Sequence, residues 1–105
     1  MGRTSAMILV MGSFRLPAAN FDKALPMMAK VIAATRAEDG CILYAYSRDV
    51  ADPEVIRVSE KWRDRAALDA HFKTAHMAAW AQERAELGLS DRDIRIFETD
   101  EGIPV

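Results

Sequence analysis

The order of two hydrophobic periodicities along the chain is the feature that most restricts its fold. Strand-like patterns, either alternating or apolar on both faces, occur in residues 6–15, 41–49, 54–62 and 92–99. Helical spacing of apolar residues occurs in two longer segments, one after the first strand and one before the last. Turn residues at 50–53 join the two central strands into a hairpin. The order predicts two β-α-β halves of similar length.

Local signals indicate where the helices begin and end. Asn20 is a candidate N-cap of the first helix, and Gly40 suits a left-handed position after its last turn. Pro26 either kinks this helix or marks its true first turn. Asp64 is expected to cap the second helix, and Thr74 to cap a continuation of it.

This order predicts the α+β, ferredoxin-like βαββαβ fold, with a four-stranded antiparallel sheet and the helices on one face. Two helices can cover only one face of such a sheet. The first, second and fourth strands nevertheless carry bulky apolar residues in both alternating sets. We therefore expect a homodimer in which the same sheet face of a second copy covers the uncovered one.

Length and charge restrict the partners. A chain of 105 residues predicts a single domain, 1–105, with a core of about residues 6–99 and loose ends at 1–5 and 101–105. The net charge is −2, and the sequence has no stripe of basic residues that could bind phosphates, so nucleic acid is not an expected partner. The apolar run 7–11 is too short for a signal sequence or membrane span, and no membrane attachment is expected.

The motifs that usually announce cofactor chemistry are absent from the sequence. Cys41 is the single cysteine, which excludes an internal disulfide and a multi-cysteine metal site and favours a cytoplasmic location. The chain has no Gly-rich phosphate loop, nucleophile elbow or dinucleotide fingerprint. Chemistry would therefore depend on acid–base groups and the substrate's own reactivity, or on a guest cofactor.

Glu60 is the first candidate for such chemistry. Strand alternation places it on one face with Ile56, Val58 and Trp62, among apolar neighbours, where an unpaired carboxylate is unfavourable. It could be a general base or a substrate-binding acceptor with a raised pKa. The alternative is a structural salt bridge to a nearby arginine, within the chain or across the dimer.

The two histidines, His71 and His76, are the second candidates. Positions five apart lie off a common face of an unbroken helix, so the pair predicts no metal site. If the helix breaks near Thr74, both side chains could converge on one cavity. His71 lies one turn after Leu68, at the flank of the buried stripe, where an imidazole can edge a pocket. The alternative for each is a half-buried histidine bonded to backbone.

Aromatic residues could supply the walls of such a pocket. Tyr44, Trp62 and Phe72 are candidate substrate contacts, and Tyr and Trp need partners for their polar atoms when buried. His76 is placed with them as a candidate substrate-binding residue. The alternative is that the aromatic side chains are simply core.

Several of these residues lie in a longer pattern. Residues 36–41, a Tyr-rich strand, Glu60-Lys-Trp62 and the run 66–76 with its two histidines resemble the antibiotic biosynthesis monooxygenase (ABM) superfamily. The resemblance covers about residues 6–99. It implies a dimeric α+β barrel and, in characterised members, oxygenation of quinols or polyketide anthrones without metal or flavin.

The resemblance also suggests roles for the residues. It implies His71 as base, Glu60 as its partner or as acceptor for a substrate hydroxyl, and Tyr44 and Trp62 as pocket walls. One alternative within the superfamily is isomerisation of a small phosphorylated signalling metabolite, and another is a non-catalytic dimeric module that binds small molecules. The heme-degrading branch uses an Asn and a Trp where this chain has Phe14 and His71, so no heme turnover is expected.

Overall fold

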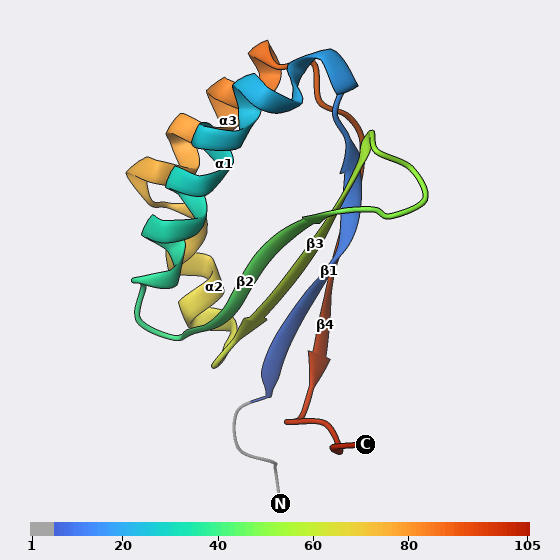
Figure 1. Cartoon of the computed structure of the whole chain (residues 1–105). Helices are drawn as coiled ribbons and strands as arrows, with labels where there is room; N and C mark the ends of the chain where they lie inside the picture. Colours follow the sequence, from blue (N-terminus) through green and yellow to red (C-terminus); the bar gives the residue numbers. More distant parts are fainter. Residues whose placement is uncertain (1–5) are drawn as a thin grey trace, which may run out of the picture.

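The computed structural model describes residues 6–105, so the expectation of a loose end at 1–5 lies outside the described residues. The elements follow in the order β1 (Met7–Arg15), η1 (Ala18–Asn20), α1 (Phe21–Arg36), β2 (Cys41–Arg48), β3 (Val55–Trp62), α2 (Arg65–Phe72), α3 (Ala75–Glu86) and β4 (Ser90–Thr99). The strands form one antiparallel sheet in the order β2-β3-β1-β4. The helices all pack on one face of the sheet (Figure 1). The predicted α+β, ferredoxin-like fold is confirmed.

The helix ends agree with the sequence signals in part. The Asp64 carboxylate accepts the Ala67 N–H at 2.9 Å and caps α2 as predicted. Asn20 stands at the N-cap position of α1, but its side chain donates to the Leu87 carbonyl at 2.8 Å and does not cap the helix. This bond ties the beginning of α1 to the end of α3. Pro26 lies inside α1 and not in its first turn.

The second helical segment is divided into two helices. α2 ends at Phe72, and α3 begins at Ala75, with the Thr74 hydroxyl accepting the Met77 N–H at 3.3 Å. The predicted cap at Thr74 is therefore confirmed, and it starts a new helix with its own direction. No helix in residues 6–105 combines the length and the apolar character that crossing a membrane requires.

Burial alternates along the strands as predicted. On β3, Ile56, Val58, Glu60 and Trp62 are buried against the helices. Beneath α1 and α3, the core is purely apolar except for Thr35, and its fully buried members include Phe14, Leu16 and Trp80. Around α2, the core includes Tyr44, Trp62 and Leu68 and lies beside the buried polar groups described below.

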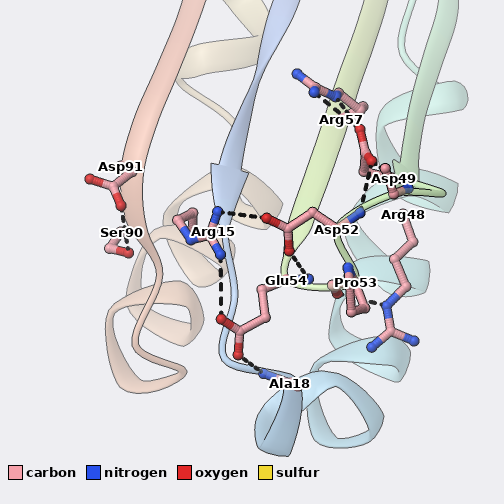
Figure 2. Close-up of polar contacts among 11 residues, drawn as sticks. Arg15, Ala18, Arg48, Asp49, Asp52, Pro53, Glu54, Arg57, Ser90 and Asp91 are labelled. Atoms are coloured by element: carbon pink, nitrogen blue, oxygen red, sulfur yellow. Dashed lines mark hydrogen bonds and ion pairs between the residues drawn. The ribbon is translucent and has the colours of Figure 1, made fainter.

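The β2–β3 turn is held by exposed polar contacts, drawn in Figure 2. The Asp49 carboxylate accepts the backbone N–H groups of Ala51 and Asp52 at 2.7 and 3.0 Å. The Arg15 guanidinium donates to Asp52 at 3.1 Å, which links β1 to the turn. Glu54 accepts the Ala18 N–H at 2.8 Å, so the same network fixes the exit of β1 into α1.

Candidate functional site

A cavity of about 420 Å³ lies between α3, the end of α2 and the helix-facing surface of the sheet. Aromatic and aliphatic side chains form most of its wall, and the polar groups on it are two tyrosines, a carboxyl, an imidazole and two guanidiniums. The lining residues are Val10, Phe14, Tyr44, Tyr46, Val58, Glu60, His71, Phe72, Met77, Ala78, Trp80, Ala81, Arg84, Leu89, Arg92, Ile94 and Ile96.

Two tyrosines from β2 supply hydroxyl groups to the cavity. The Tyr44 and Tyr46 hydroxyl oxygens lie 2.8 Å apart, so one hydroxyl donates to the other. Burial raises the pKa of both phenols, and the two tyrosines therefore remain neutral. The hydroxyl that accepts this bond keeps its own proton, which can be donated to an oxygen of a ligand.

His71 is the buried imidazole at one end of this cavity. It projects from the last turn of α2, its side chain is 1% exposed, and its ring packs at 4.8 Å from the Trp62 ring. Its Nδ1 lies 2.7 Å from the Glu38 carboxylate. Burial lowers the pKa of His71, although Glu38 opposes this effect. A neutral ring that donates Nδ1–H to Glu38 carries its lone pair on Nε2, which has no hydrogen-bond partner within residues 6–105.

Glu38 reaches His71 because of the tight connection between α1 and β2. Gly40 has a φ of +85°, as its predicted left-handed position requires, and a Cβ there would lie 2.5 Å from the Ala67 Cβ on α2. The loop therefore passes close against α2. The break between α2 and α3 brings in His76, whose Nε2 lies 2.6 Å from the same Glu38 oxygen.

Glu60 lies on β3 and is 7% exposed. The Trp62 indole N–H donates to its carboxylate at 2.9 Å. Burial raises the pKa of Glu60 to about 7, although Trp62 and Arg92 act in the opposite direction. Near neutral pH this carboxyl therefore exists in both protonation states, and it can accept or donate a proton at the cavity wall.

The contacts of Glu60 differ from those predicted from the sequence. Glu60 was a candidate partner of His71, but Glu38 holds that position. The salt bridge considered for Glu60 is also not formed within residues 6–105, because the hydrogen bond there comes from Trp62. Burial, and not a charge partner, dominates its environment.

The predicted substrate contacts divide into two sets. Tyr44, Glu60, His71 and Phe72 line the cavity. Trp62 is fully buried beneath the cavity wall and acts there through its bond to Glu60. His76 contacts Glu38 and is not on the cavity wall, so the two histidines converge on a carboxylate instead of on a common cavity.

Glu38, His71 and His76 are also the residues best placed to hold a metal ion. Their three ligand atoms lie within 4.8 Å of one another. Both imidazoles, however, contact the same carboxylate oxygen at hydrogen-bonding distance. A metal ion would have to replace both shared protons, and the three side chains satisfy one another without one.

Sequence reasoning missed three polar residues of the site. Glu38 lay in a motif segment but received no chemical role, and only the fold places it beside His71. Arg84 on α3 and Arg92 on β4 also line the cavity. The signal was present, because Arg84 follows Trp80 by four residues on α3 and Arg92 alternates with Ile94 on β4. Periodicity thus places both arginines on the face that lines the cavity. Because arginine is ordinarily exposed, the sequence alone suggests surface positions for both.

Comparison with known proteins gives consistent results. A profile described as antibiotic biosynthesis monooxygenase matches residues 7–83. "Probable quinol monooxygenase YgiN" of Escherichia coli is 32% identical over 82 residues, which cover 70% of this chain and 78% of that protein. The uncharacterised protein sll1783 of Synechocystis is 28% identical over 94 residues, which cover 90% of this chain and 64% of that one. The chain thus spans just under two thirds of the length of this relative.

Solved structures share the fold. A crystal structure from Deinococcus radiodurans, described as a candidate antibiotic biosynthesis monooxygenase, superposes with a TM-score of 0.87. The superposition covers 93% of this chain and 97% of the other, at 24% sequence identity. This likeness concerns the arrangement of helices and strands.

Proposed function

Because this chain belongs to the antibiotic biosynthesis monooxygenase family, we propose that it is a monooxygenase that acts on a quinol-like or polyketide-like aromatic substrate without metal or flavin. The observation that carries this proposal is the pair formed by His71 and Glu60. An imidazole with a free Nε2 and a carboxyl with a pKa of about 7 line one aromatic-walled cavity. The name of the E. coli relative supports a quinol as the substrate class.

The proposed reaction begins with proton transfer. Nε2 of His71 accepts the proton of a phenolic hydroxyl, and the Glu38 carboxylate stabilises the imidazolium through Nδ1–H. The electron-rich phenolate then transfers one electron to O2, and the two radicals combine to form a carbon–oxygen bond. Loss of water from the peroxide leaves a carbonyl group on the substrate. One oxygen atom enters the product and the other leaves as water, and the substrate supplies all the electrons.

The cavity wall supports an aromatic substrate over a small sugar-derived one. Phe14, Tyr46 and Trp80 offer ring faces and edges to a flat ligand. Tyr46 and Tyr44 add a hydroxyl that can orient a ligand oxygen. A low-polarity wall also makes proton transfer to His71 less dependent on bulk water.

The test is O2 consumption with chemically reduced menadione and with a naphthol, corrected for autoxidation. We expect the wild-type protein to exceed the uncatalysed rate with at least one of them, with one O2 taken up per hydroxylated quinone formed. Analysis of the product by mass spectrometry with ¹⁸O2 should show one labelled oxygen. Rates equal to background across a panel of quinols would contradict the proposal and favour the isomerase or binding-module alternatives.

We further propose that a second copy of the chain covers the outer face of the sheet. This face exposes large apolar side chains, with Met11 at 49%, Leu43 at 43% and Phe97 at 48% exposure. Met11 and Phe97 come from the neighbouring strands β1 and β4, and they lie on the face opposite the helices. An obligate homodimer interface commonly buries about 2,000 Å² or more.

Light scattering tests this assembly. We expect a dimer at micromolar concentration for the wild-type protein. Replacing Phe97 with Lys should shift the equilibrium toward monomer because it places a charge among the apolar side chains of this face. Replacing the exposed Val50 in the β2–β3 turn with Lys is the matched control and should leave the dimer intact. A monomeric wild-type protein would refute the proposal.

A further inference from the structure

Two arginines on the cavity wall differ from the other arginines of the described chain. Within residues 6–105, Arg84 and Arg92 form no hydrogen bond and no ion pair. Every other arginine in that range has at least one polar partner: Arg15, Arg36, Arg48, Arg57, Arg63, Arg65 and Arg95. Both unpaired guanidiniums of the described chain thus lie on the wall of the same cavity.

The two cations approach each other at the cavity, where Arg84 is half-buried and Arg92 is exposed, and an anion bound by both would relieve their repulsion. Arg84 projects from α3 and Arg92 from the beginning of β4, and each feels the other's charge. Burial and the neighbouring Arg92 both lower the pKa of Arg84, although the guanidinium stays protonated at neutral pH. Glu60 faces the same cavity but offers no full negative charge near neutral pH. Within residues 6–105, neither arginine therefore has a fully ionised carboxylate as its partner.

We propose that Arg84 and Arg92 form an anion subsite that binds an acidic group, a carboxylate, on the aromatic substrate. This inference rests on the proposed function and narrows its substrate class to phenolic or quinolic aromatic acids. A guanidinium fork matches a carboxylate in shape and charge, and two forks from different elements fix its position.

The distances along α3 agree with such a ligand. Met77 lines the cavity near His71, and Arg84 lines it at the other end of the helix. Seven residues of α-helix correspond to about 10 Å, which is close to the length of a two-ring aromatic acid. A ring held between the tyrosines and Trp80 would direct its phenolic oxygen to His71 and Glu60 and its acidic group to the arginines.

Binding measurements under anaerobic conditions test the subsite directly, because no O2 is present to react with the ligand. Calorimetry compares 6-hydroxy-2-naphthoate, whose hydroxyl and carboxylate lie at opposite ends of the ring system, with 2-naphthol, which lacks the carboxylate. We expect the acid to bind the wild-type protein at least about 10-fold more tightly, because charge-assisted hydrogen bonds replace those to water. Arg84→Gln and Arg92→Gln should each remove most of this preference, because they lower the affinity for the acid much more than the affinity for 2-naphthol. Arg84→Lys should restore part of it.

Arg65→Gln is the matched control, because Arg65 is exposed on α2 and pairs with Asp69 away from the cavity. It should leave both affinities unchanged. Preference for 6-hydroxy-2-naphthyl phosphate over 6-hydroxy-2-naphthoate would support the anion subsite and identify phosphate as the group it binds. A sugar phosphate without a ring that bound as tightly as the aromatic acid would overturn the aromatic part of the proposal. Equal affinities for the acid and the naphthol would overturn the subsite.

O2 uptake with 5,8-dihydroxy-2-naphthoate, a quinol with its carboxylate on the other ring, separates this inference from the proposed function. If the arginine-dependent preference is found and O2 uptake stays at background, the subsite stands and the monooxygenase proposal fails. If uncharged quinols are oxygenated as efficiently as the acid and the arginine variants change nothing, the monooxygenase stands and the subsite fails.

Discussion

The two ends of β3 carry carboxylates in opposite environments. At the turn that precedes Val55, Asp49 and Asp52 are solvent-accessible and accept hydrogen bonds from backbone N–H groups and from arginines (Figure 2). These bonds lower the pKa of both aspartates. Near the other end, Glu60 is buried with one hydrogen bond from Trp62, and burial raises its pKa to about 7.

The two environments have opposite effects on stability. Lowered pKa values mean that folding favours the ionised aspartates, so they stabilise the turn at neutral pH. The raised pKa of Glu60 means that folding disfavours its ionised form, and the carboxyl therefore destabilises the protein above its unfolded-state pKa. A buried group that lowers stability is expected at a functional site more often than in a structural role. The comparison thus separates a structural polar network from a candidate catalytic one.

Replacing His71 with Ala should have the largest effect. Removing the proposed base is expected to lower kcat for O2-dependent quinol oxidation by about 100-fold or more per folded molecule. His76→Ala is the matched control, since it removes the second imidazole from Glu38 and keeps the bond to His71. We expect His76→Ala to change kcat several-fold at most, because His76 takes no part in the proposed proton transfer. Equal losses in both variants would show that the three side chains act only as a structural unit.

Glu60→Gln should raise the stability of the protein at neutral and alkaline pH. The unfolded carboxyl ionises near pH 4.5 and the folded one near pH 7, so wild-type stability falls as the pH rises between these values. The glutamine has no charge to bury and keeps an oxygen for the Trp62 N–H. We expect a gain of about 3 kcal/mol in the free energy of unfolding near pH 8 that vanishes near pH 4.

Denaturant titrations at several pH values measure this gain. Glu86→Gln is the control, because Glu86 lies exposed in the last turn of α3. It should show no such growth of stability with pH. A loss of stability in Glu60→Gln near pH 8 would contradict this prediction. It would indicate that the ionised carboxylate forms a salt bridge, for example with an arginine of a second copy of the chain.

Most of the fold could be predicted from the sequence because it depends on periodicity and on local caps. The strand alternation of residues 55–62 and the caps at Asp64 and Thr74 appear in the structure as expected. β4 begins at Ser90, two residues before the predicted start, because Ser90 pairs with Arg15 beyond a register shift in the β1–β4 ladder. Asp91, with a φ of +51°, lies in this irregularity, and no pattern in the sequence predicts it. Asn20 occupies the predicted N-cap position of α1 but forms no capping bond, because its side chain donates to a tertiary acceptor, the Leu87 carbonyl.

The site was harder to predict, because its contacts are long-range. Glu60 and His71 were recognised from apolar surroundings and helix position, and both line the cavity. Glu38 lies 33 residues from His71 in the sequence, and only the packing of the α1–β2 loop against α2 brings them together. Arg84 and Arg92 look like ordinary surface cations until the cavity between α3 and β4 is known.

Glu38→Gln should have an intermediate effect on catalysis. The amide can still accept a hydrogen bond from His71, but the negative charge that raises the imidazole pKa is lost. The pKa of His71 should therefore fall further, and the acid limb of the kcat/KM profile should move to lower pH. We expect kcat to fall about 10-fold because the base is weaker and the imidazolium is less stabilised. An unchanged pH profile with reduced thermal stability would assign Glu38 a purely structural role.

Asp52→Asn should give the smallest effect and the opposite pH dependence to Glu60→Gln. The asparagine keeps an acceptor for the Glu54 N–H but loses the ion pair with Arg15, which is solvent-accessible and contributes little to stability. Because the pKa of Asp52 is lowered in the folded state, its contribution is present at neutral pH and is lost as the pH falls through that pKa. We therefore expect a slightly lower melting temperature at neutral pH, no difference from wild type in strong acid, and an unchanged kcat. A loss that grew toward acid pH, or a change in kcat, would show that the two ends of β3 are coupled and would break the comparison.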